Sequence, residues 1–250
     1  MDIELTLWTG LVFLLAGAVK GITGMGLPTV AVSLLGLVMA PAQAAALLVA
    51  PSLLTNLAQC RGPQARALAA ALWPLWLGLI AGVLLTPAAS PALPDPHQLL
   101  GAALLAYGGW GLLRQARPQR PPAEPAPRGR LQAALFALLI GLCTGAITAV
   151  TAVFVIPLVP YLQARRLSRE ALIQAQGLCF MIATLALALR LQASPQAPLW
   201  SVDTLLALAT ALVGMAVGGR WRQRLSGPAF QRALFLVLMG LGLANLLHGR

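Results

Sequence analysis

Residues 21–28 read Gly-Ile-Thr-Gly-Met-Gly-Leu-Pro and interrupt a long apolar run near the start of the chain. Three glycines and a proline in eight residues do not sustain a regular helix, because glycine is conformationally free and proline lacks an N–H. Irregular backbone at membrane depth is tolerated only where it is buried in protein or lines a cavity. The stretch therefore predicts a broken helix, with Pro28 in the first turn of the helix that follows.

The composition around this break is that of a membrane protein. Of the 250 residues, 59% are hydrophobic and 9% are charged, and the mean hydropathy is +0.82. A soluble domain carries about 25% charged residues. The net charge of +11 does not indicate a nucleic-acid partner, because the arginines lie in short gaps between apolar runs. Such loops are typical of the cytoplasmic side of proteins in a lipid bilayer.

Apolar segments divide the chain into two similar sets. The first set is expected at about 5–20, 27–40, 42–60, 67–86 and 99–113, and the second at about 131–146, 149–162, 171–189, 199–219 and 229–247. A spanning helix needs roughly 20 residues, so the last three segments of each set are expected to span, the one at 99–113 if it extends to Arg117. The first two segments of each set are shorter and form either one kinked helix or a hairpin that re-enters on the same side. The acidic start MDIELTLW does not resemble a cleavable signal, so the first segment is expected in the mature chain.

The positions of the basic residues decide between these alternatives. Of the 17 basic residues, 14 fall in four clusters: Arg61 and Arg66; Arg114, Arg117, Arg120, Arg128 and Arg130; Arg165, Arg166 and Arg169; and Arg220, Arg222, Arg224 and Arg232. If all four clusters are cytoplasmic, each short pair must return to the side on which it began. Each half then crosses an odd number of times, and the halves are inverted relative to each other, as in many secondary transporters. Both termini are expected on the outer side of the membrane.

The predicted fold is an all-α, polytopic helical bundle of two inverted repeats, each a broken or re-entrant helix pair plus three spanning helices. The first repeat covers residues 1–116, a cytoplasmic linker rich in proline and arginine covers 117–130, and the second repeat covers 131–250. Internal symmetry supports the division. Four small residues recur in order: Gly17 and Gly21 as Gly141 and Gly145, and Gly78 and Gly82 as Gly214 and Gly218. The run after the first break also resembles the run after the second and places Ser33 opposite Pro157.

Lys20 stands directly before the first break and is the main candidate for binding chemistry. A lysine inside a membrane segment is costly and is a functional candidate by default. The free amides after Gly24 and the dipole of the next helix favour a negative group. The predicted anion site therefore contains Lys20, Gly21, Thr23, Gly24 and Gly26. The alternative is a lysine that extends to the membrane interface or serves in packing.

Polar residues elsewhere complete the predicted cavity. The second break is expected around Gly141 to Thr151, where Thr144 takes the place of Lys20 and Gly145 and Thr148 follow. The alternative for each threonine is a hydrogen bond back to its own helix. Asn56 and Gln59 share a face of the 42–60 helix and either line a path or hold helices together, and Gln174 and Gln176 are expected to hold helices together.

Several classes of site are absent from the sequence. Cys60, Cys143 and Cys179 form no metal-ligand spacing with His97 or His248, so no metal or other cofactor is expected. There is no Ser/His/Asp set, no HExxH and no phosphate loop, so the protein is expected not to be an enzyme. No membrane-embedded acid is present, which argues against a cation pathway.

Four stretches resemble the TauE/SafE family of sulfite and organosulfonate exporters: GAVKGITGMGLPTVAVSLL, ALLVAPSLLTNLAQ, GLCTGAITAVTAVFVIPLVPYLQ and ALIQAQGLCF. The resemblance covers most of the chain apart from the linker, and it implies a permease of two related halves that moves sulfur-containing anions across a bacterial inner (cytoplasmic) membrane. Both termini are then expected on the periplasmic side. The expected function is transport of sulfite, an organosulfonate or a carboxylate by alternating access, with a homo-oligomer as a further possibility. The alternative is a membrane scaffold or assembly factor that does not transport.

Overall fold

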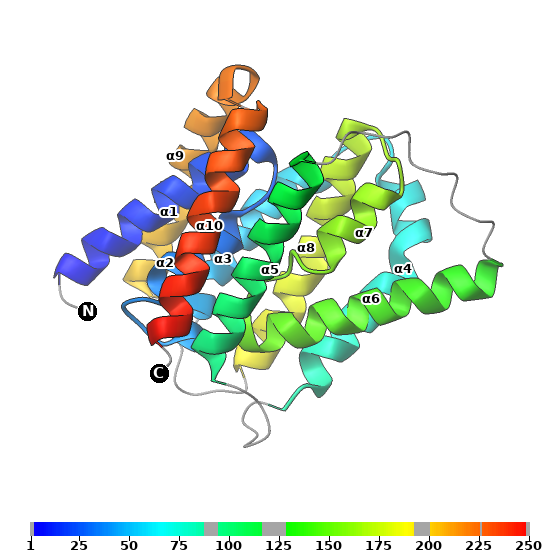
Figure 1. Ribbon diagram of the computed structural model, residues 1–250, viewed down its shortest axis with the longest axis horizontal. Coiled ribbons are helices and arrows are strands. Elements are labelled where there is room, and N and C mark those ends of the chain that lie inside the picture. Colours follow the sequence, from blue (N-terminus) through cyan, green and yellow to red (C-terminus); the bar gives the residue numbers. More distant parts are fainter. Residues whose placement is uncertain (1–2, 88–94, 117–128, 193–200, 226, 249–250) are drawn as a thin grey trace.

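The computed structural model describes residues 3–87, 95–116, 129–192, 201–225 and 227–248, which form helices joined by turns (Figure 1). The helices are α1 (Ile3–Thr23), α2 (Leu27–Leu35), α3 (Pro41–Cys60), α4 (Ala65–Leu85), α5 (Pro96–Ala116), α6 (Arg130–Thr151), α7 (Leu158–Ala164), α8 (Arg169–Gln192), α9 (Val202–Leu225) and α10 (Pro228–His248). The all-α prediction is confirmed. The predicted linker lies outside the described residues apart from Gly129 and Arg130.

Seven of these helices are long and apolar enough to cross a bilayer: α1, α3, α4, α6, α8, α9 and α10. They include the predicted spans in α3, α4, α8, α9 and α10. Helix α5 has 21 residues, the same length as α4, but is less apolar. The prediction that the first segment of each half is too short to span was wrong, since α1 has 21 residues and α6 has 22.

Helices of the first half pack against helices of the second half. Helix α1 packs along α9, and α6 packs along α4. A Cβ on Gly17 or Gly21 would overlap the backbone of α9, and a Cβ on Gly141 or Gly145 would overlap the backbone of α4. The glycines therefore allow backbones to approach closely, as in other small-residue interfaces in membranes. This close packing offsets the roughly 1 kcal/mol that glycine costs inside a helix, so both helices run through their glycines.

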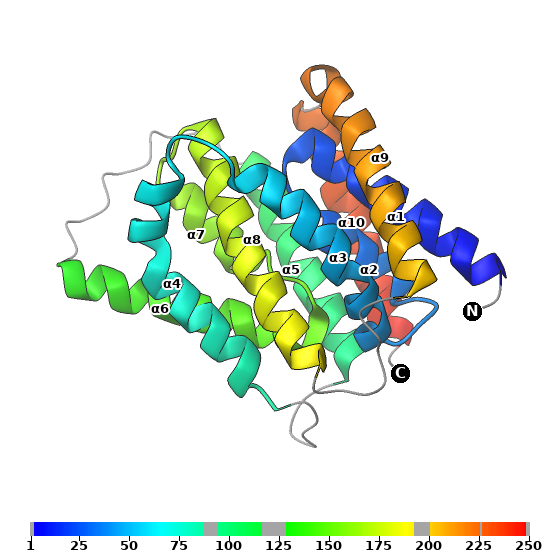
Figure 2. The same cartoon turned by 180° about the vertical axis from the view of Figure 1, so that it is seen from behind.

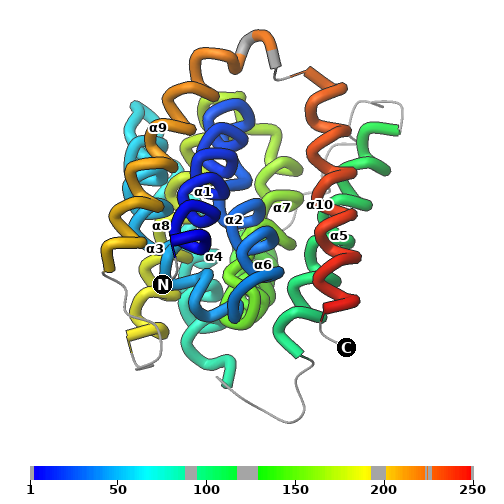
Figure 3. Tube along the Cα trace, turned by 90° about the vertical axis from the view of Figure 1, so that its left-hand side faces the viewer, coloured from blue at the N-terminus to red at the C-terminus, as the bar shows by residue number. Residues whose placement is uncertain are grey.

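The first two helices of each half form a pair that turns back. Helix α1 runs toward the end of the molecule where α9 meets α10, and α2 returns from it (Figures 1 and 3). The turns between α3 and α4 and between α7 and α8 lie at that same end (Figure 2). Three of the predicted basic clusters lie at or beside the turns at this end, which join α3 to α4, α7 to α8 and α9 to α10. The start of α1 and the end of α10 lie away from this end. The α1–α2 pair therefore turns back, as the hairpin alternative requires and a single kinked helix does not.

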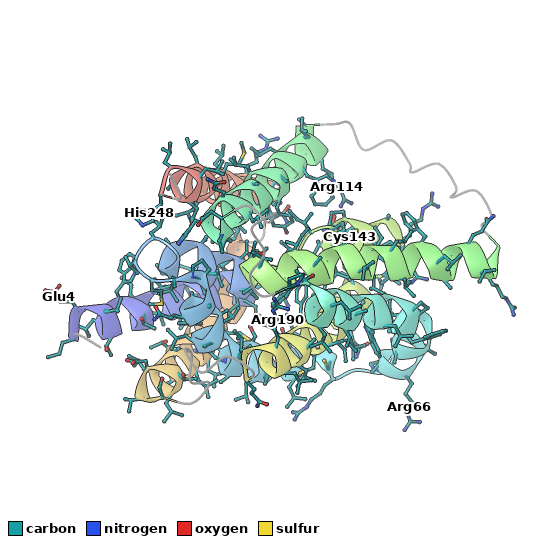
Figure 4. All side chains as sticks on the ribbon, turned by 90° about the horizontal axis from the view of Figure 1, so that it is seen from below. Glu4, Arg66, Arg114, Cys143, Arg190 and His248 are labelled. Carbon is teal, nitrogen blue, oxygen red and sulfur yellow. The ribbon has the colours of Figure 1, made fainter. Side chains whose placement is uncertain are left out.

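Arg190 lies away from the basic end, and its contacts explain the exception. Its Nη1 donates to the carbonyl oxygens of Val83 at 2.9 Å and Thr86 at 2.5 Å. These are carbonyls at the C-terminal end of α4, where a cation is favourable. Arg190 is half-buried, whereas Arg66 is exposed and points outward (Figure 4).

The short elements occupy the core. Eight of the nine residues of α2 are buried, and Val153, Phe154 and Val155 are at most 1% exposed. Their backbone is shielded by the longer helices, as irregular structure at membrane depth requires.

The second break lies later than predicted. Helix α6 continues through Thr151, and the chain is non-helical from Ala152 to Pro157. Ala152 is left-handed with φ 54°, and Val-Phe-Val-Ile before Pro157 favours extended backbone, since proline disfavours helix in the residue before it. The proposed equivalence of Ser33 and Pro157 fails for the same reason, because Ser33 lies inside α2 whereas Pro157 precedes α7.

Candidate functional site

The first break is a tight turn between α1 and α2. Gly24 and Gly26 are left-handed, with φ 84° and 98°, a conformation that glycine adopts at little cost. The hydroxyl of Thr23 accepts from the amide of Met25 at 3.1 Å and donates to the carbonyl of Val19 at 2.8 Å. Helix α2 then starts with Pro28 in its first turn. The predicted break is confirmed in position and in the residues that form it.

Lys20 is buried one turn before this break. Its side chain is 2% exposed, and its ammonium donates to Asn56 Oδ1 and, at 3.0 Å, to Thr55 Oγ1. Thr55 Oγ1 in turn donates to the carbonyl of Pro51 at 2.7 Å, so it meets Lys20 with a lone pair. Lys20 therefore points inward to α3 and does not extend to the membrane interface. Its partners among the described residues are neutral oxygens, with no carboxylate.

This arrangement leaves donors without acceptors. An ammonium has three N–H donors and no acceptor, and Thr55 and Asn56 account for two of them. Because Asn56 presents Oδ1 to the lysine, its Nδ2 faces elsewhere, and that buried atom has no hydrogen-bond partner among the described residues. One turn away on α3, the buried hydroxyl of Ser52 also lacks a partner within the described part of the chain. Buried polar groups are normally hydrogen-bonded, so the unused donors and the positive charge of this cluster can accommodate an anionic acceptor.

A pocket of about 490 Å³ leads to Lys20 from the basic end of the molecule. It lies between α1, α3, α8 and α9 and is lined by Lys20, Gly21, Ala58, Gln59, Arg61, Gly62, Pro63, Glu170, Ile173, Gln174, Met215, Gly219 and Arg222. Two of these residues hold the break in place. Gln59 Nε2 donates to the carbonyl of Gly24 at 2.6 Å, and Arg222 Nε donates to the carbonyl of Ile22 at 3.2 Å.

A family profile described as "Sulfite exporter TauE/SafE" matches residues 9–245, nearly the whole chain. The chain belongs to the TauE/SafE family. This family consists of transporters rather than enzymes, so the chain is a multi-pass membrane transporter. No curated protein and no solved structure matches it significantly.

In this TauE/SafE protein, seven of the ten predicted site residues lie together. Lys20, Gly21 and Gln59 line the pocket, Asn56 holds Lys20, and Thr23, Gly24 and Gly26 form the turn above it. The three residues from α6 are not among the residues that line the pocket. Thr144 and Thr148 donate to the carbonyls of Ile140 and Thr144, each at 2.7 Å, and Gly145 packs on the backbone of α4. The local alternative for these threonines, a bond to their own helix, is the one observed.

The glutamines of α8 behave differently from each other. Gln174 Nε2 donates to the carbonyl of Cys60 at 3.2 Å, which joins α8 to α3 as predicted. Gln176 is 1% exposed, and neither end of its amide has a partner among the residues that the structure describes, so the predicted role in holding helices together is not seen there for this residue.

Sequence analysis missed Arg222, Arg61 and Glu170 as pocket residues. The two arginines entered the sequence prediction only as orientation markers, and Glu170 was not among the predicted residues. The signal for Arg222 was its position at the apolar end of a basic run, close to the glycines of α9 that pack against α1.

Proposed function

We propose that this TauE/SafE transporter moves small anions by alternating access at the Lys20 site. The substrate class is sulfite, an organosulfonate or a related small carboxylate. The observation that carries the proposal is a buried ammonium with neutral partners beside the unpartnered donor of Asn56. A buried charge is costly unless it is paired, and a bound anion would supply the missing partner.

The surroundings of the pocket support selection for negative charge. Lys20, Arg61 and Arg222 line it together with one acid, Glu170. Lys20 attracts anions and repels cations inside the membrane, where charge interactions are weakly screened. The amide donor of Asn56 can hydrogen-bond an oxyanion but cannot bind a metal cation.

Alternating access is supported by the difference between the two ends of the molecule. The pocket opens at the basic end, and the second break fills the interior with Phe154, whose ring lies 5.1 Å from that of Phe180. We place the basic end in the cytoplasm of a bacterium, following the positive-inside rule. The site would then load from the cytoplasm, as export requires, and would release on the periplasmic side after α1–α2 and α6–α7 rearrange.

Transport by purified protein in liposomes tests the proposal. Radiolabelled sulfite should enter by saturable counterflow, and Lys20→Ala should abolish it. Arg66→Ala is the matched control, because it removes a positive charge from an exposed side chain at the same end outside the pocket. Flux without saturation or counterflow would indicate a channel. If no sulfite, sulfonate or carboxylate crosses, and Lys20→Ala alters only complex formation, the protein is a scaffold.

A further inference from the structure

Arg222 faces the same pocket as Lys20 but at a shallower depth. Its Nε contacts the carbonyl of Ile22, and one of its terminal nitrogens would lie 3.2 Å from a Cβ on Gly24. The amide of Gly24 bonds to the carbonyl of Lys20, so Arg222 sits over the turn that follows the lysine. The contacts of helix α3 give the same order of depth, since Gln59 bonds to Gly24 while Asn56, deeper in the helix, bonds to Lys20. The two levels are separated by about one helical turn, roughly 5 Å.

Most of the guanidinium of Arg222 is unused. It has five N–H donors, and among the described residues its one hydrogen bond is from Nε to Ile22. That bond orients the side chain over the last carbonyls of α1, where a cation is favoured. The four N–H groups of the two terminal nitrogens remain for a ligand. The glycine at position 24 allows this close approach, because a side chain there would crowd the guanidinium.

We propose that Arg222 is an outer anion-binding residue that receives the substrate before Lys20 does and selects for oxyanions. The inference rests on the proposed function of the Lys20 site. A planar guanidinium fork binds two oxygens of one sulfite, sulfonate or carboxylate group at once. A halide offers a single centre and cannot bridge the fork in this way. An ammonium at position 222 would keep the charge but lose the two-oxygen geometry.

Kinetics of sulfite counterflow in liposomes, with chloride as a competing anion, test this assignment. Arg222→Lys should raise the KM for sulfite about tenfold, which corresponds to about 1.4 kcal/mol, with a maximal rate within about twofold of wild type. The inhibition constant for chloride should not change. Arg222→Gln keeps a donor for Ile22 but removes both charge and fork, so it should weaken sulfite and chloride together. Folding of each variant is checked by its thermal unfolding midpoint in detergent.

Gln59→Leu distinguishes binding from a structural role. Gln59 also holds the break, through Gly24, but carries no charge. If Arg222 only stabilises the break, Arg222→Lys and Gln59→Leu will each change the KM for sulfite and the inhibition constant for chloride in the same proportion. That result would show the assignment to be wrong. An unchanged KM in Arg222→Lys also overturns it. If wild-type transport is saturable and Lys20→Ala abolishes it, the proposed function stands even when the Arg222 assignment fails. If the wild type does not transport, both the proposed function and the Arg222 assignment are wrong.

Discussion

The two helix breaks occupy comparable places in the two halves but differ in chemistry. The first, at Gly24 and Gly26, is formed by glycines and held by polar contacts from Gln59 and Arg222 beside a pocket. The second, Ala152–Pro157, is formed by bulky apolar residues and buried completely at Phe154. A helix pair that turns back is therefore lined with polar contacts in one half and packed with apolar side chains in the other.

The glycine interfaces identify equivalent positions in the two halves. Gly17 and Gly21 meet the carbonyls of Ala211 and Met215, and Gly141 and Gly145 meet those of Leu75 and Leu79, in the same four-residue steps. In this register Thr144 corresponds to Lys20, as the sequence predicted. Helix α6 nevertheless continues one turn further than α1, which moves its break deeper along the chain. The first half has a charge at this position, and the second has a hydroxyl that bonds within its own helix.

The largest expected effect comes from removing the Phe154 ring from the second break. Phe154→Ala removes a fully buried ring that packs against Phe180. We expect a loss of roughly 3 kcal/mol in unfolding free energy, at the low end for buried phenylalanine because lipid also solvates apolar groups. Detergent unfolding measures it. A loss below about 1 kcal/mol would mean that the second break is not tightly packed.

Substitutions at the equivalent positions 20 and 144 compare the two breaks directly. Lys20→Thr gives the first half the residue found in the second, and we expect kcat/KM for sulfite to fall by at least about 100-fold, or about 2.7 kcal/mol. Thr144→Val, at the equivalent position, removes only a bond to Ile140 and should leave kcat/KM within about twofold. Comparable losses in both variants would place α6 in the binding site after all.

The smallest effect concerns backbone strain at the two turns. Gly24→Ala puts a Cβ on a left-handed residue next to Arg222, and we expect it to cost about 1–2 kcal/mol of stability. Ala152→Gly relieves the same type of strain but adds chain entropy, so its stability should change by less than about 1 kcal/mol. Thermal unfolding of the pair measures both effects. Equal destabilisation by the two substitutions would show that left-handed geometry is not what requires glycine at position 24.

Much of the fold could be predicted because its signals are local. Apolar runs of spanning length and basic clusters between them predicted the long helices and the pair α1–α2 that turns back, and the glycine pairs marked positions where helix backbones meet. The second break could not be found this way, because Ala152–Pro157 is as apolar as a helix core and Gly141 and Gly145 suggested an interruption that packing on α4 prevents. Lys20 and Asn56 could be found because polar groups are rare in these segments. Arg222 carried a weaker signal, its place at the apolar end of a basic run, and its contact with Ile22 spans 200 residues of chain.

The exchange of helices between halves has a consequence for synthesis. The glycine face of α1 packs on α9, which the ribosome makes almost 180 residues after α1 ends. Until then the first helix enters the bilayer with its lysine and without its permanent neighbour. The chain cannot complete one repeat and then the other, as separate domains do. Helix α10, made after α9, packs in turn on α5, so the first half finds its last partners only when the final two helices have been made.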